Sequence, residues 1–403
     1  MVRRIALSLL ALLAIGAALF FGFAPGWVEA SMNKVDGKPL IPVSDEARAL
    51  HATLTIVDLH SDTLMWNRSL VKQGSRGHED LPRMQQGNVA LQVFSSVTKT
   101  PAGLNYDRNS RDTRDNITPL VIAQLQPMRS WWSLAERSIW HARKLDRAVR
   151  RSQGALRKVA DDAGLDALLA ARRGATGTPP VGAILSIEGL HDLEYKRKNL
   201  DRMYDAGFRM ASLTHFFDNG LAGSMHGVKK GGLTPFGREI VTAMEDKGMV
   251  VDIAHCSHAC VAEVLAMARR PVISSHGGVQ ATCKVNRNLT DEEIRGIART
   301  GGVIGIGYWE GAVCDTSPRA TARAMKHVRD LVGIDYVALG SDYDGATTVR
   351  FDTSRLVQVT QALLDEGFSH EDIRKAMGLN ALRVLRRGMI PFAQLPPAKA
   401  GAA

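Results

Sequence analysis

Histidine and carboxylate side chains follow several of the apolar runs that resemble β-strands in this chain of 403 residues. The first of these runs, residues 53–59, is followed by His60 and Asp62. Residues two apart on a strand point to the same side, so this imidazole and this carboxylate would leave the strand end together. Such a pair suits a divalent cation such as zinc. A single His-x-Asp can equally cap a strand and start a turn, so the other strand ends decide between the two interpretations.

Seven further apolar runs have the length and β-branched content of strands. They cover residues 89–95, 181–187, 208–213, 249–253, 271–274, 302–307 and 336–339. Helical patterns lie between most of them, for example at residues 235–247, 259–269, 291–299 and 320–332. This alternation predicts an α/β fold with a parallel sheet, and eight units favour a closed (β/α)8 TIM barrel. A doubly wound open sheet is the alternative, which the lack of a glycine-rich turn after the first strand disfavours.

A barrel would gather the scattered strand ends into one site. The carboxyl ends of parallel barrel strands meet on one face, so residues there become neighbours whatever their separation in the sequence. Six of the eight strand ends carry a possible ligand or acid–base group. These residues are His60, Asp62, Glu188, His215, His255, His276 and Asp342.

A pair of metal ions is the chemistry that this set favours. We expect His60 and Asp62 to hold one zinc ion and His255 and His276 to hold the second. Each ion then lacks ligands, and a carboxylate from Glu188 could bridge the two. Two ions that share a water molecule lower its pKa towards neutrality and polarise a carbonyl group. Manganese or cobalt would suit the same ligands.

Two residues of the set remain for proton transfer and charge stabilisation. Asp342 is the candidate proton shuttle from the water to a leaving amine, and His215 is the candidate donor to a developing oxyanion. His191 and Asp344 lie beside these motifs. We expect each of them either to orient a metal ligand or to stabilise a turn. Six histidines away from the strand ends are expected on the surface or in packing: His51, His78, His141, His226, His258 and His327.

The amino terminus predicts export. Arg3 and Arg4 precede an almost unbroken apolar run over residues 5–24, and small residues follow around Ala30 and Ser31. This is the pattern of a secretory signal cut after Ala30 or of an uncleaved membrane anchor, and the sequence leaves both open. The basic residues on the short side predict that the rest of the chain lies outside the cytoplasm, in the periplasm or a similar space.

After a leader of residues 1–30, residues 31–390 are expected to form the barrel domain. Residues 101–174 are polar, rich in arginine and largely helical in pattern, and we expect an excursion between two strands there. Residues 391–403 are expected to be a flexible tail. The net charge of +10 is spread among acidic residues, so no nucleic-acid partner is expected.

The four cysteines of an exported chain can form disulfides. Cys256, Cys260, Cys283 and Cys314 allow three pairings, and spacing alone does not choose among them. Cys256 and Cys260 lack a CxxC pattern, so structural or free thiols are expected there in preference to a zinc pair.

Taken together, these motifs resemble the membrane (renal-type) dipeptidase family, peptidase family M19. The resemblance runs from about residue 50 to about residue 388 and departs from the family at Ser61, where Asn is usual. It implies a barrel with two zinc ions that hydrolyses free dipeptides, including those with a C-terminal D-residue, by a hydroxide that bridges the metals. The motifs that carry it are Asp58-Leu59-His60-Ser61-Asp62, Ile187-Glu188-Gly189, Leu213-Thr214-His215, Asp252-Ile253-Ala254-His255, Ser275-His276 and Gly340-Ser341-Asp342-Tyr343-Asp344-Gly345.

The resemblance implies two further features. Arg287 would pair with the terminal carboxylate of the substrate, a contact that a guanidinium group makes well. Cys283 and Cys314 would form a disulfide. Separately, a homodimer is one possible assembly. Two alternative functions remain: a related barrel hydrolase that acts on another amide, an ester or a lactam, and a non-catalytic envelope protein that binds metal or dipeptides.

Overall fold

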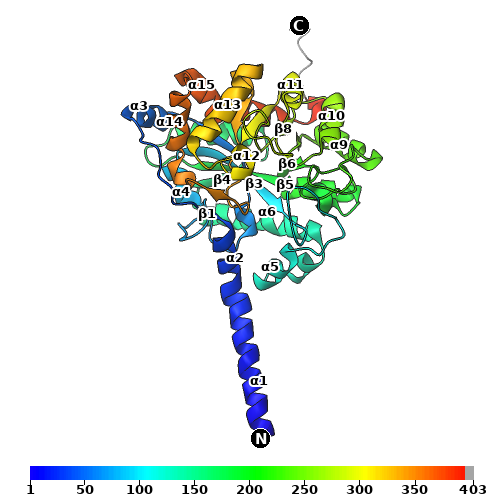
Figure 1. Cartoon of the computed structure of the whole chain (residues 1–403). Helices are drawn as coiled ribbons and strands as arrows, with labels where there is room; N and C mark the ends of the chain where they lie inside the picture. The colour runs from blue at the N-terminus through cyan, green and yellow to red at the C-terminus, as the bar shows by residue number, and fades with distance from the viewer. Residues whose placement is uncertain (395–403) are drawn as a thin grey trace.

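Eight parallel strands form a closed barrel in the computed structural model, which describes residues 1–394 (Figure 1). The ring closes because the second strand of the barrel pairs with the third and the last pairs with the first. The predicted (β/α)8 barrel is therefore confirmed. In chain order the barrel strands are β2 (Ile56–Ser61), β3 (Val89–Val97), β5 (Val181–Glu188), β6 (Phe208–Ser212), β7 (Val250–Asp252), β8 (Ile273–Ser274), β9 (Val303–Ile306) and β10 (Val337–Leu339).

Helices surround the strands, and their ends carry clear capping residues. Thr234 caps α9, and Thr290 forms a reciprocal capping box with Glu293 at the start of α11. Both of these helices have the bounds that the sequence pattern predicts. The surrounding helices are α4 (Leu81–Gln86), α8 (Arg197–Ala206), α9 (Pro235–Lys247), α10 (His258–Met267), α11 (Asp291–Arg299), α13 (Pro318–Val332) and α14 (Val357–Asp365).

One core cluster joins buried side chains from all eight barrel strands with the helix α16 (Asn380–Met389). α16 contacts β2, β7, β9 and β10, which lie in different parts of the ring. The barrel is therefore packed with side chains, and its functional groups must lie at an end of the strands.

The excursion begins with an irregular stretch over residues 101–116 and is then largely helical, with one strand that the sequence pattern did not predict. It contains α5 (Ile117–Ala123), a 3-10 turn η3 (Met128–Trp131), α6 (Leu134–Arg151), β4 (Leu156–Lys158) and α7 (Asp162–Arg173). β4 pairs in parallel with the start of β5, outside the barrel ring. Only Leu156 of β4 is buried, which explains why its three residues show no strand periodicity.

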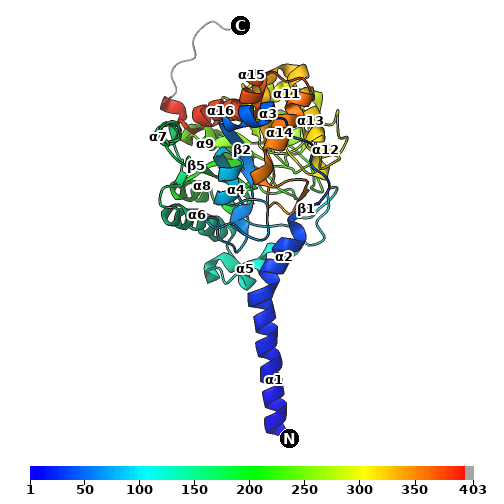
Figure 2. The same cartoon turned by 90° about the vertical axis from the view of Figure 1, so that its left-hand side faces the viewer.

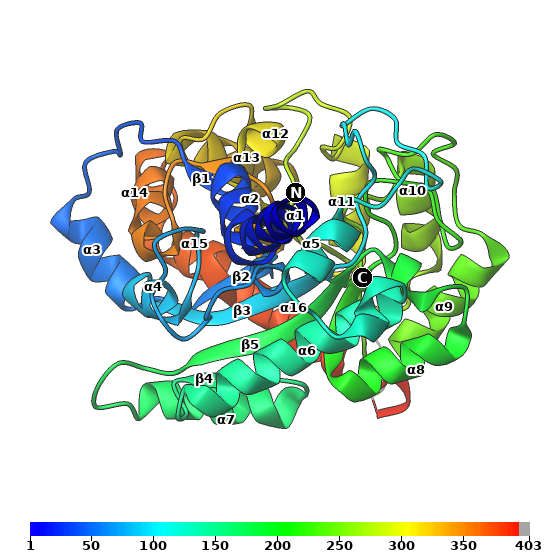
Figure 3. The same cartoon turned by 90° about the horizontal axis from the view of Figure 1, so that it is seen from below.

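The amino-terminal segment is one helix from Val2 to Met32, long and apolar enough to cross a membrane. It consists of α1 (Val2–Ala17), a π-helical turn η1 (Ala18–Phe23) and α2 (Ala24–Met32). α1 is exposed along its whole length and projects from the barrel domain (Figures 1 and 2). α2 lies against the barrel domain, beside α5. Seen along the helix, α1 and α2 lie in front of the barrel (Figure 3).

Short elements complete the ends of the chain. After α2, β1 (Lys34–Val35) pairs in parallel with β11 (Thr348–Val349) from the loop that follows β10. Of the predicted tail at residues 391–403, Phe392–Gln394 form a short 3-10 turn, η8, and residues 395–403 lie outside the described part of the chain.

Candidate active site

The predicted ligands converge at the carboxyl ends of the barrel strands. Glu188, at the end of β5, lies at the centre: its Oε1 is 2.9 Å from Nε2 of His255 and 3.2 Å from Nε2 of His276. Its Oε2 lies 3.5 Å from Nε2 of His60, which is also 3.5 Å from Oδ1 of Asp62. The two oxygens of one carboxylate thus face two different sets of side chains, as a bridging ligand requires.

The donor atoms of this cluster fit divalent metal ions. Within residues 1–394, several buried polar atoms here lack a hydrogen-bond partner, including both ring nitrogens of His60 and Oδ1 of Asp62. Nε2 of His255 and Nε2 of His276 face each other at 3.0 Å. Imidazole nitrogens and carboxylate oxygens that converge without protein partners are suitable ligands for zinc and similar metals. Three overlapping groups could hold an ion: His60, Glu188 and His276; Glu188, His215 and His255; and His60, Asp62 and Asp342.

Burial and mutual charge set the protonation of the cluster. Burial opposes the ionisation of Glu188, but the charges of His215 and His60 outweigh it and hold the pKa of Glu188 well below its ordinary value. Burial and the charge of Glu188 raise the pKa of Asp62 to about 7. Burial and the nearby carboxylates raise the pKa of Asp342 well above its ordinary value. Several carboxylates at such short range need cations to ionise together.

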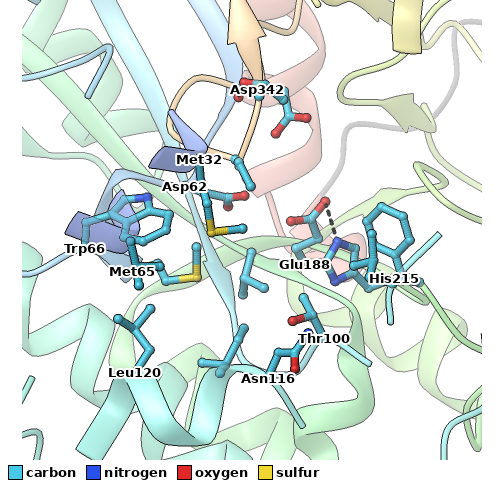
Figure 4. Close-up of a pocket in the computed structure, with 18 of the residues that line it drawn as sticks. Met32, Asp62, Met65, Trp66, Thr100, Asn116, Leu120, Glu188, His215 and Asp342 are labelled. Atoms are coloured by element: carbon cyan, nitrogen blue, oxygen red, sulfur yellow. Dashed lines mark hydrogen bonds and ion pairs between the residues drawn. The ribbon is translucent and has the colours of Figure 1, made fainter. Parts of the chain in front are cut away.

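Asp342 and His215 flank the cluster on opposite sides of Glu188 (Figure 4). Oδ1 of Asp342 lies 3.9 Å from Nε2 of His60, and Nε2 of His215 lies 3.7 Å from Oε1 of Glu188. Asp342 and His255 both have left-handed backbones, with φ values of 56° and 64°. Non-glycine residues in this region are uncommon and concentrate at functional sites.

The loop around Asp342 also depends on a glycine. A Cβ atom on Gly345 would lie 2.0 Å from Oδ1 of Asp342. Only glycine therefore allows the carboxylate of Asp342 to take its position beside the cluster.

Two buried aspartates that the sequence analysis did not select position the ligands. Asp58, inside β2, accepts hydrogen bonds from the backbone N–H of His60 and of Ser341 at 3.1 Å each. Asp252, at the end of β7, accepts them from the N–H of Ala254 at 3.0 Å and of Ser275 at 2.9 Å. Each carboxylate thus fixes the backbone next to metal-ligand candidates on two neighbouring strands. A charged residue inside an apolar run, two or three positions before a histidine, is the pattern that could have identified both.

Asp344 and His191 take supporting positions. Asp344 accepts hydrogen bonds from the hydroxyl of Thr63 and the backbone N–H of His78, both at 2.6 Å, and pairs with Arg68. Nε2 of His191 contacts the hydroxyl of Thr98 at 2.9 Å. Both residues therefore stabilise the loops that carry the site.

One of the six histidines expected on the surface or in packing, His226, lies near the ligand cluster. His226 is buried and stacks on Phe216 with 4.6 Å between ring centroids. Its ring centroid is also 5.3 Å from that of His255, so its packing supports a ligand candidate. His226 thus belongs to the wall of the site.

Arg287 lies beside the cluster and is held by a disulfide-closed segment. Its guanidinium group stacks over Trp309 at 4.7 Å from the ring centroid, and it donates to the carbonyl of His276 at 3.4 Å. Cys283 and Cys314 form a disulfide, which confirms the expected bridge and encloses both Arg287 and Trp309. The bridge therefore fixes the two side chains in one unit.

The other two cysteines are free and buried. The thiol of Cys260 donates to Sγ of Cys256 at 2.9 Å. The groups of described residues that could hold a metal ion include neither of them. As free and buried thiols they agree with the favoured interpretation of the sequence.

A cavity of about 780 Å³ opens over the cluster. Asp62, Glu188, His215, Arg287 and Asp342 line its polar part. Its remaining wall is mostly apolar, with polar groups such as Thr100, Asn116 and Glu310, and much of it comes from segments outside the barrel ring, which the sequence analysis did not identify. Figure 4 shows Met32, Met65, Trp66 and Leu120 gathered on the Asp62 side, away from His215.

Residues 44–389 match the family described as membrane dipeptidase, peptidase family M19. An uncharacterised dipeptidase of Schizosaccharomyces pombe is 28% identical over 339 residues, which cover 80% of this chain and 75% of the relative. The dipeptidase aclJ of Aspergillus oryzae is 34% identical over 215 residues, or 51% of each chain.

Solved structures show the same fold. The probable dipeptidase PvdM of Pseudomonas aeruginosa superposes with a TM-score of 0.71 at 19% identity, covering 85% of this chain and 98% of that one. A metallopeptidase of Rhodobacter sphaeroides, solved with a phosphinate mimic of the dipeptide L-Ala-D-Ala, has a TM-score of 0.66 at 22% identity and covers 83% and 99%. Because the family match spans most of the barrel domain, the chain belongs to the membrane dipeptidase family and is a metallo-dipeptidase.

Proposed function

We propose that this protein is an exported dipeptidase that uses two zinc ions to hydrolyse free dipeptides, including those with a C-terminal D-residue. The observation that supports the two-ion site most directly is the position of Glu188, whose two carboxylate oxygens face His60 on one side and His255 with His276 on the other. His60 and Asp62 would hold one ion, and His255 and His276 the other. Bound there, the ions would activate a water molecule and polarise the carbonyl of the peptide bond.

The residues around the ions would orient the dipeptide and move protons. The guanidinium group of Arg287, stacked on Trp309, would receive the C-terminal carboxylate of the substrate. His215 would donate to the oxygen of the scissile carbonyl as negative charge develops on it. Asp342 would accept a proton from the attacking water and deliver it to the nitrogen of the leaving amine.

Two observations support export and tolerance of D-residues. The apolar helix Val2–Met32 and the Cys283–Cys314 disulfide suit a chain that leaves the reducing cytoplasm. The structure from Rhodobacter sphaeroides was solved with a mimic of L-Ala-D-Ala, which makes that dipeptide the first D-residue substrate to test.

The test combines metal content with a substrate panel. The full chain, purified in detergent, is analysed for bound metals and assayed with L-Ala-L-Ala, L-Ala-D-Ala and their N-acetylated and C-amidated forms. We expect two zinc ions per chain and cleavage of the free dipeptides only. Glu188→Gln should lose metal and activity, because an amide cannot bridge two cations, whereas the exposed control Glu292→Gln should keep both. Cleavage of the amidated forms at equal rates, or one metal per active chain, would contradict the proposal.

A further inference from the structure

We infer that the amino-terminal helix is retained in the mature protein and that its last turns, in α2, form a wall of the substrate pocket that receives an apolar side chain of the N-terminal residue of the dipeptide. This inference rests on the proposed function and names a substrate class for it. It differs from a cleaved signal, in which residues 1–30 would play no part in the folded enzyme. Three sets of contacts, the position of the wall and the length of the helix carry the argument.

A buried ion-pair network holds α2 against the barrel domain. Glu29 is 1% exposed, and its two carboxylate oxygens accept hydrogen bonds from Nε of Arg68 and Nε of Arg76, each at 2.6 Å. Arg68 is itself buried and also pairs with Asp344 in the loop of Asp342. Cleavage after Ala30 would remove Glu29, so Arg68, whose side chain is 6% exposed, would keep only Asp344 as an anion. Arg76, which is more exposed, would lose its ion pair at a smaller cost.

The residues that follow α2 are attached to the same loop. Oδ1 of Asn33 accepts from the backbone N–H of Ala346 at 2.9 Å, and the N–H of Lys34 donates to the carbonyl of Thr347 at 3.1 Å. His78 connects the two segments: its Nδ1 accepts from the N–H of Asp344 and its Nε2 donates to the carbonyl of Lys34, both at 3.1 Å. The end of the helix and the loop that carries Asp342 therefore form one unit.

Apolar contacts complete the wall. Val28 packs against a small core cluster of the barrel domain, made of Met65, Trp66, Val97, Ile117 and Val121. The same face of the helix lines the cavity over the metal-ligand cluster. The lining residues from the helix are Phe20, Ala24, Pro25, Val28 and Met32.

The position of this wall determines which part of a dipeptide it contacts. Arg287 lies against His276 and Trp309. Met32 lies beside Asp62, with Glu188 between it and His215 (Figure 4). With the terminal carboxylate at Arg287 and the peptide bond at Glu188, the side chain of the N-terminal residue extends towards Met32. The neighbours there are apolar, so burial of an apolar side chain is favoured over a small or charged one.

The length of the helix places this pocket at a membrane surface. Residues 2–19, which precede the first lining residue Phe20, rise about 27 Å at about 1.5 Å per residue, close to the roughly 30 Å of a hydrocarbon core. The pocket then begins where the bilayer ends. The anchor and the substrate wall are consecutive parts of one helix.

The first experiment identifies the mature amino terminus. The full chain is expressed with its own leader, extracted from membranes and analysed by intact mass and terminal sequencing. We expect residues upstream of Ser31 to be present. A chain that begins at Ser31 would overturn the inference.

The second experiment measures side-chain preference with Leu-Ala and Gly-Ala. Met32→Ala should lower the ratio of kcat/KM for Leu-Ala over Gly-Ala by about 10-fold, through KM, because the leucine side chain loses its apolar contact. The control Trp27→Ala alters an exposed residue of α2 that does not line the cavity, and should leave the ratio unchanged.

The outcomes separate this inference from the proposed function. A ratio that stays constant in Met32→Ala, while the wild type cleaves both dipeptides, would overturn only the wall assigned to α2. A wild-type protein that cleaves neither dipeptide would contradict the proposed function itself.

Discussion

The pocket has two halves that are built in different ways. Its polar half comes from the carboxyl ends of barrel strands, with Glu188 at the centre and His60, His255 and His276 around it. Its apolar half comes from segments outside the ring: α2, the turn after β2 that carries Met65 and Trp66, and α5. The comparison teaches that the barrel supplies the chemistry, while elements added to it supply the surface that a substrate side chain meets.

The largest effect should come from Asp342 in the polar half. Asp342→Asn keeps a side chain that tolerates the left-handed backbone at this position but removes the carboxyl that we propose moves the proton. We expect kcat to fall by about 10²- to 10⁴-fold with metal content and KM for L-Ala-D-Ala nearly unchanged. Steady-state kinetics on metal-analysed protein measure this, and a variant with ordinary kcat would exclude Asp342 as the proton carrier.

A smaller effect is expected from the buried aspartate behind the ligands. Asp58→Asn replaces the carboxylate that accepts from the backbone of His60 and Ser341, so the ligand strand loses part of its fixed orientation. Metal affinity should fall by about 10- to 100-fold, as measured by competition with a chelator. Activity should return when the metal is in excess. Loss of activity that excess metal does not restore would assign Asp58 a different role.

The smallest effect is expected from Lys144, which supports the turn that carries part of the apolar half. Lys144 donates to the backbone carbonyls of Leu64 and Trp66 at 2.6 Å each, and burial lowers its pKa from the ordinary 10.5 to about 7. The folded protein therefore binds this proton more weakly than the unfolded chain, so stability should rise as pH increases from about 7 towards 10.5.

The variant Lys144→Met isolates this contribution. Between pH 7 and pH 9.5, the thermal midpoint of the wild type should rise relative to that of Lys144→Met, since methionine carries no titrating group. The exposed control Lys198→Met should keep the wild-type pH dependence. Parallel profiles for the wild type and Lys144→Met would show that Lys144 is charged in the folded protein.

The two halves also differ in how far the sequence predicts them. The strand ends combine apolar β-branched runs with residue types of distinctive chemistry, so Glu188 and its histidines could be identified one by one, and barrel geometry brought them together. Asp58 belongs to the motif Asp58-Leu59-His60-Ser61-Asp62, yet only the hydrogen bonds of the folded chain reveal its supporting role.

No comparable pattern marks the apolar half. Met32 follows an export-like apolar run, and nothing in residue types indicates that this run docks back onto the domain. Trp66 and Leu120 resemble ordinary core residues, because methionine, leucine and tryptophan line pockets and fill cores alike. In the excursion, Trp131 packs against the core cluster that includes Met65 and Trp66, whereas the neighbouring Trp132 is 68% exposed.

The disulfide between Cys283 and Cys314 has a consequence for when the enzyme becomes active. The 31-residue separation encloses Arg287 and Trp309, and closing a loop of this length stabilises the fold by about 3 to 4 kcal/mol in the chain-entropy view. In a reducing compartment the same segment is held by non-covalent contacts alone, and the cost of ordering it then falls on substrate binding. On the proposed function of an exported dipeptidase, chains in which this bridge has not yet formed would thus hold dipeptides weakly.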